Sequence, residues 1–97
     1  MKVAATIEAK LRAALAPTRL AVVDESHRHR GHAGARPEGE SHFHVEIVAS
    51  AFDGLSRIDR QRRVYDILAG ELAGPVHALS VTARTPREDE LAHKPAG

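Results

Sequence analysis

The 97-residue chain is long enough for one small domain, and its core must be largely aliphatic because only three residues are aromatic. Its formal net charge of +1 gives no strong general attraction toward nucleic acid. The absence of cysteine excludes disulfides, zinc–thiolate sites and an iron–sulfur cluster held by the chain's own thiolates. Residues 1–17 are amphipathic and no segment reaches the roughly 20 apolar residues of a membrane span, so we expect a cytoplasmic protein without a signal peptide.

The first part of the chain predicts a helix, a strand and a long loop. Residues 5–16 place an apolar side chain at every fourth position, which is typical of one helical stripe, and Pro17 ends this helix. Residues 19–25 form a short, β-branched run and predict a strand. Residues 26–41 contain glycine, proline and histidine but no large apolar side chain, so they predict a polar loop.

The second part predicts a strand, a helix, a strand and a tail. Residues 42–50 alternate between apolar and polar side chains, as in a strand with one buried face. Residues 56–73 predict a helix, or a short helix followed by a longer one, and residues 76–83 a third strand. We expect a core over residues 5–86 and a polar C-terminal tail over 87–97. The expected apolar face of the helical segment consists of Ile58, Tyr65, Leu68 and Leu72.

The order α-β-β-α-β restricts the topology of the fold. The first two strands are expected to pair as an antiparallel hairpin, whereas a strand–helix–strand crossover normally returns in parallel. We therefore predict an α+β sandwich, with a three-stranded mixed sheet and helices on one of its faces. Residues 1–97 are expected to form a single domain.

Histidines are the most prominent candidates for chemistry. His27, His29 and His32 lie in the predicted loop, where neutral imidazoles could close on a metal or could simply be solvated. His77 opens the last predicted strand and could be either a half-buried structural residue or an exposed side chain at the rim of the sheet. We expect no enzyme, because the sequence has no nucleophile elbow, phosphate loop or cysteine.

Two other patterns allow a functional and a plain interpretation. His42 and His44 share one strand face and could bind a metal together, although an open polar sheet face explains them equally well. A cluster of arginines in the predicted helix could contact phosphates, but a solvated helix face is the simpler interpretation. The arginines of this cluster are Arg57, Arg60, Arg62 and Arg63.

Four sequence blocks, taken in order, resemble the BolA family. They are DESHRH at 24–29, ESHFHV at 40–45, FDGL at 52–55, and Glu71-Leu72 followed by VHALS at 76–80. The resemblance covers roughly residues 7–86. It implies a class II KH-like α-β-β-α-β fold, which agrees with the order of the predicted elements. It also implies a protein that is a monomer or a weak homodimer when alone.

The resemblance further implies an adaptor that pairs with a monothiol glutaredoxin and shares a [2Fe-2S] cluster with it. The glutaredoxin and glutathione would each supply a thiolate. The histidine of the VHAL block, here His77, would be one ligand from this chain. The second would come from the loop, where His29 and His32 are the candidates. Many relatives carry a histidine in the second helix where this chain has Arg62, so no ligand is expected there.

Members of the family are also linked to transcriptional control and cell morphology under stress. The alternative implied function is therefore a DNA-binding regulator, which would use the arginine cluster of residues 57–63. The cluster-sharing adaptor, with a role in iron–sulfur transfer or in iron- and redox-linked regulation, is the leading hypothesis.

Overall fold

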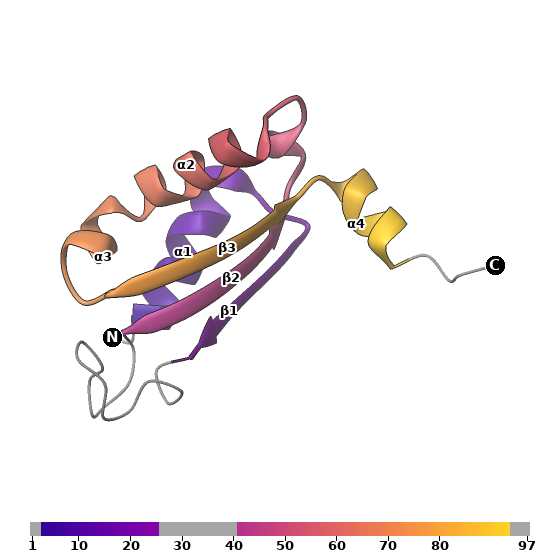
Figure 1. Ribbon diagram of the computed structural model, residues 1–97. Coiled ribbons are helices and arrows are strands. Elements are labelled where there is room, and N and C mark those ends of the chain that lie inside the picture. Colours follow the sequence, from indigo (N-terminus) through magenta and orange to yellow (C-terminus); the bar gives the residue numbers. More distant parts are fainter. Residues whose placement is uncertain (1–2, 26–40, 94–97) are drawn as a thin grey trace.

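The computed structural model describes residues 3–25 and 41–93, and Figure 1 shows a twisted sheet with helices packed on one side. The α+β class with a three-stranded mixed sheet is confirmed. Within these two ranges, no helix is both long and apolar enough to cross a membrane. The elements are α1 (Val3–Leu15), β1 (Arg19–Asp24), β2 (His42–Val48), the 3-10 helix η2 (Ser50–Phe52), α2 (Arg57–Ile67), α3 (Ala69–Ala73), β3 (Ala78–Arg84) and α4 (Pro86–Ala92).

The central strand of the sheet is β2, between β1 and β3. It pairs antiparallel with β1, where Val45 lies opposite Val22, and parallel with β3, where Val45 lies opposite Val81. Because β2 and β3 run in the same direction, both strands begin at the same end of the sheet. Residues from two distant parts of the sequence therefore meet at that end.

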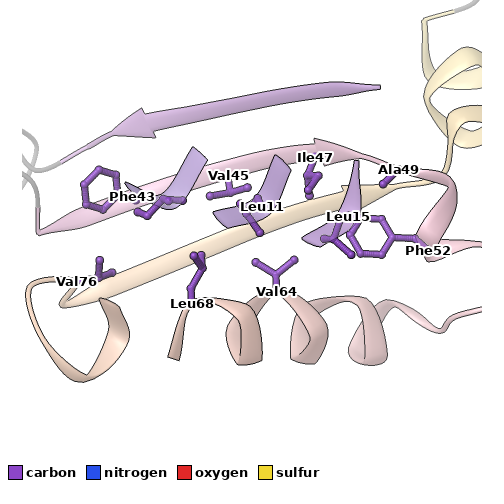
Figure 2. Packing of buried hydrophobic residues seen from close by; sticks show 11 residues of the cluster. Leu11, Leu15, Phe43, Val45, Ile47, Ala49, Phe52, Val64, Leu68 and Val76 are labelled. Carbon is purple, nitrogen blue, oxygen red and sulfur yellow. The ribbon is translucent and has the colours of Figure 1, made fainter. Parts of the chain in front are cut away.

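The hydrophobic core lies between the sheet and the helices α1 and α2 (Figure 2). The predicted stripe of α1 is confirmed, because Ile7, Leu11 and Leu15 are all buried. The predicted alternation of β2 is confirmed on its inner face, where Phe43 and Val45 are at most 2% exposed. This layer of aliphatic and aromatic side chains packs the helices against the sheet.

The apolar face predicted for the second helix is partly wrong. Ile58 lies in the first turn of α2 and is 64% exposed, whereas Val64 is fully buried. The helix begins after Ser56, whose hydroxyl accepts a hydrogen bond from the backbone N–H of Asp59. This start directs the stripe of Arg60, Val64 and Leu68, spaced four residues apart, toward the sheet.

The polar tail predicted over 87–97 is also wrong in its first part, which belongs to the helix α4 (Pro86–Ala92). Thr85 accepts a hydrogen bond from the backbone N–H of Glu88, while the Glu88 carboxylate accepts one from the backbone N–H of Thr85. This reciprocal pair is a capping box, and Pro86 suits the first turn because its missing N–H would have no helical partner. The signal was present in the sequence as Thr85-Pro86-Arg87-Glu88.

Loss of this cap has a defined cost. Thr85→Ala is expected to lower the free energy of unfolding by about 1 kcal/mol, because it leaves an N-terminal backbone N–H of α4 without its acceptor. Urea denaturation measures the change. Thr85→Ser retains the hydroxyl and should lose much less, so an equal loss in both variants would show that the cap is not the source of the effect.

Candidate metal-ligand site at the sheet edge

His77 lies directly before β3, and its side chain is exposed. Its backbone N–H donates to the carbonyl of Ser41 at 2.7 Å, and the N–H of Ala78 donates to the same oxygen at 3.1 Å. Ser41 itself is fully buried. The backbone of His77 is therefore held by the sheet while its imidazole faces solvent, so of the two positions left open by the sequence the structure shows the exposed rim.

A second histidine lies close to His77 at the end of the sheet where β2 and β3 begin. The ring of His42, the first residue of β2, lies 5.5 Å from the His77 ring between centroids, with a 50° angle between the planes. His42 is only 8% exposed, and its Nδ1 lies 2.8 Å from the Ser41 hydroxyl. Local sequence patterns do not reveal this pair, because one histidine begins β2 and the other directly precedes β3. The parallel register, which places His42 opposite Ala78, is the signal that would have found it.

The hypothetical metal pair of His42 and His44 is not favoured by this geometry. Nδ1 of His44 lies 2.7 Å from the hydroxyl of Ser80 on β3. Nδ1 of His42 is directed to Ser41 instead. In the described part of the chain, no group of three or more histidine, aspartate or glutamate side chains could hold a metal ion. Any metal bound here would need further ligands from elsewhere.

The loop histidines His27, His29 and His32 lie outside the described residues. The residues that flank segment 26–40, Glu25 and Ser41, are hydrogen-bonded to the sheet. The backbone N–H of Glu25 donates to the carbonyl of His42 at 2.7 Å, and Ser41 accepts from His77. Glu25 and Ser41 are therefore both held at the end of the sheet that presents His77.

The exposed imidazole of His77 fits the role of one metal ligand. Neutral imidazole binds iron, zinc and copper, and the side chain is accessible to a partner without unfolding any element. A [2Fe-2S] cluster needs four ligands, which the described residues do not provide together. This end of the sheet can therefore contribute the His77 imidazole to a ligand set that other groups complete.

The predicted arginine cluster divides into two parts. Arg57, Arg62 and Arg63 are exposed on α2 and could meet an anion. Arg60 does not belong with them, because it is only 7% exposed. Its guanidinium donates to the backbone carbonyls of Leu55 at 3.0 Å and Ala83 at 3.3 Å. The position of Arg60 therefore does not favour the predicted contact with nucleic acid, since helical phase turns this side chain toward the sheet.

Arg60 also connects α2 to α4 through an ion pair with Glu88. Two nitrogens of Arg60 donate to the two carboxylate oxygens of Glu88, at 2.5 and 3.2 Å. The hydrogen bond from Arg60, followed by that from the Thr85 backbone, lowers the pKa of Glu88 from 4.5 to about 2. The ionised form of Glu88 is thus favoured in the folded protein.

This pair makes stability depend on acid. Because the folded-state pKa of Glu88 is depressed, its contribution is present above pH 4.5 and is lost as the pH falls toward about 2. Glu88→Gln should therefore be less stable than the parent protein at neutral pH and should lose less stability on acidification. Urea unfolding at neutral pH and at about pH 3 measures both. Equal losses on acidification in the two proteins would contradict the assignment.

Fold and site together define a small α+β domain in which an exposed histidine directly precedes the parallel edge strand. The family model described as BolA-like protein matches residues 11–88. A Sinorhizobium protein described as an uncharacterized protein in the cobS 5′ region is 48% identical over 89 residues, which cover 91% of this chain and 96% of that protein. The chain therefore belongs to the BolA family.

Solved structures agree with this membership. BolA1 from Arabidopsis thaliana superposes with a TM-score of 0.81 at 39% identity, covering 91% of this chain and 96% of that one. The BolA domain of SufE1 from the same plant gives 0.79 at 44% identity, covering 88% and 93%. The chain spans 23% of the whole SufE-like protein 1 and 54% of the plant protein BOLA1. The shared part is thus the BolA domain itself.

Proposed function

We propose that this protein is a cytoplasmic, non-enzymatic adaptor that binds a monothiol glutaredoxin and shares a [2Fe-2S] cluster with it. Glutaredoxin and glutathione would supply thiolates, which this chain lacks. His77 would supply one imidazole, and His29 or His32 the other. A mixed imidazole and thiolate ligand set resembles that of Rieske centres, which raises the reduction potential relative to an all-thiolate cluster.

The observation that supports this proposal best is the position of His77. Its backbone N–H and that of Ala78 both donate to the carbonyl of buried Ser41, while its imidazole is exposed at the end of the sheet that also holds Glu25 and Ser41. An exposed ligand on a fixed backbone suits a cluster that lies between two proteins. Membership of the BolA family supports the same function.

The test is an anaerobic reconstitution. The protein is mixed with a monothiol glutaredoxin, iron, sulfide and glutathione, and visible absorbance and circular dichroism are recorded. We expect a chromophore whose dichroism differs from that of the glutaredoxin alone. Substituting His29 and His32 by alanine one at a time then identifies the second ligand, because one of the two variants should lose the new signal. A spectrum identical to that of glutaredoxin alone would overturn the proposal.

A second candidate function is DNA binding. A relative from Escherichia coli is described as the DNA-binding transcriptional regulator BolA, and it is 46% identical over 90 residues, covering 93% of this chain and 82% of that protein. The exposed Arg57, Arg62 and Arg63 on α2 provide three cations for phosphates. Gel shifts at increasing salt test this function. Arg63→Glu should weaken the complex, and the absence of any shift at low salt would exclude it.

A further inference from the structure

A groove of about 670 Å³ lies at the end of β3 that is remote from His77. Its floor is the edge of β3 from Val81 to Arg84. One wall is α2, which contributes Arg57 and Gln61, and the other is α4, which contributes Leu91. Figure 1 shows α4 next to the end of β3, away from the end at which that strand begins. This groove has no part in the proposed cluster site.

The outer edge of β3 carries backbone groups that point away from β2. The N–H of Ala78 donates to Ser41 at the start of the parallel ladder, so alternate residues from Ala78 onward direct their backbone groups toward β2. The residues between them, Leu79, Val81 and Ala83, direct theirs to the outer edge. Because β3 is an edge strand, no further strand within the described residues meets these groups.

Along the outer edge of β3, more backbone N–H groups than carbonyl groups are left without a hydrogen-bond partner among the described residues. The hydroxyl of Tyr65 donates to the carbonyl of Leu79 at 2.6 Å, and Arg60 donates to that of Ala83 at 3.3 Å. Two of the three outward carbonyls are thus occupied by side chains of α2. The outward N–H groups of Leu79, Val81 and Ala83 have no acceptor among the residues that the structure describes. The edge therefore favours a ligand that is rich in acceptors.

The charged side chains of the groove also favour a ligand that carries acceptors. Arg60 is neutralised by Glu88 at 2.5 Å, and Arg84 lies 3.9 Å from Asp89. Arg57 is exposed and forms no ion pair within residues 3–25 and 41–93. It supplies a free cation at the mouth of the groove, beside an edge of free N–H groups. An anionic ligand would meet both.

We propose that this groove binds an extended acidic peptide segment of a partner protein, which lies beside β3 and supplies carbonyl and carboxylate acceptors to the free N–H groups of that strand. The carbonyls of an extended peptide recur every second residue, as do the free N–H groups of Val81 and Ala83. Its acidic side chains would face Arg57. Its aliphatic side chains would contact Leu91, which is 56% exposed and lines the groove. The groove is therefore expected to prefer peptides in which acidic and aliphatic residues alternate.

The experiment follows backbone amide chemical shifts by NMR. The probe is a capped pentapeptide of alternating glutamate and valine, and the control probe replaces glutamate by lysine. The acidic peptide should shift the amides of Val81 and Ala83. Arg57→Glu should weaken this binding about tenfold, because it replaces an attraction by a repulsion. Arg63→Glu makes the same charge change on α2 outside the groove and should leave the affinity unchanged.

Three results would overturn the proposal. One is the absence of amide shifts at millimolar acidic peptide, and another is an equal response to the lysine peptide. The third is a response of the same amides to a short oligothymidylate but not to the acidic peptide, which would assign the groove to nucleic acid. Both variants change exposed side chains, so loss of fold is not expected to obscure the comparison.

Discussion

His77→Ala is expected to abolish the chromophore that this protein forms with a monothiol glutaredoxin, while leaving its own fold intact. The side chain is exposed, and the hydrogen bond to Ser41 that holds the residue is donated by its backbone N–H, which alanine retains. The free energy of unfolding should therefore change by no more than about 0.5 kcal/mol. Visible circular dichroism of the reconstituted mixture, together with urea denaturation of the free protein, measures both quantities.

His44→Ala is the matched control for this variant. His44 is also a histidine of the sheet, but it is hydrogen-bonded to Ser80 on the open face. Its replacement should leave the chromophore unchanged. A chromophore that survives His77→Ala and disappears in His44→Ala would place the ligand on the open face of the sheet and contradict the assignment of His77.

Phe52→Ala is expected to lower the free energy of unfolding by about 3–5 kcal/mol, the range for deleting a buried aromatic ring. Phe52 closes η2, is fully buried, and belongs to the same core cluster as Leu15 and Val64 (Figure 2). Small domains have a total stability of only about 5–15 kcal/mol. This one substitution should therefore remove a large part of the stability, which urea denaturation monitored by far-ultraviolet dichroism would detect.

The control for Phe52→Ala is Ile58→Ala, which also removes a large apolar side chain. Ile58 is 64% exposed, so its loss should change the free energy of unfolding by no more than about 0.5 kcal/mol. Comparable losses in the two variants would contradict the burial of Phe52 and the helical phase of α2 described above.

Much of the fold could be predicted because local spacing and burial agree. The stripe of Ile7, Leu11 and Leu15 and the alternation that buries Phe43 and Val45 are local patterns, and each one specified the face that became buried. The parallel return of the last strand followed from a general rule of chain connection. The exposed position of His77 was one of two possibilities that local sequence left open.

What could not be predicted depended on contacts between distant residues. Arg60 looked like its exposed neighbours, yet its partner Glu88 is 28 residues away and belongs to a helix that was expected to be a tail. Ile58 looked apolar enough for the core, but the cap at Ser56 turned the buried stripe elsewhere. The contact of His42 with His77 required the register of two strands, which local sequence patterns do not contain.

The parallel pairing of β2 with β3 has a consequence for folding kinetics. Paired residues of these strands, such as His44 and Ser80, are 36 positions apart, so their contact closes a long loop and raises the contact order. The end of the sheet that holds His42 and His77 is thus expected to form late, after the helices. The His77 amide, hydrogen-bonded to Ser41, should become protected in pulse-labelled hydrogen exchange later than the amides of α1. A chain that is still folding would then not yet hold His77 in position to bind a metal, whatever partner is present.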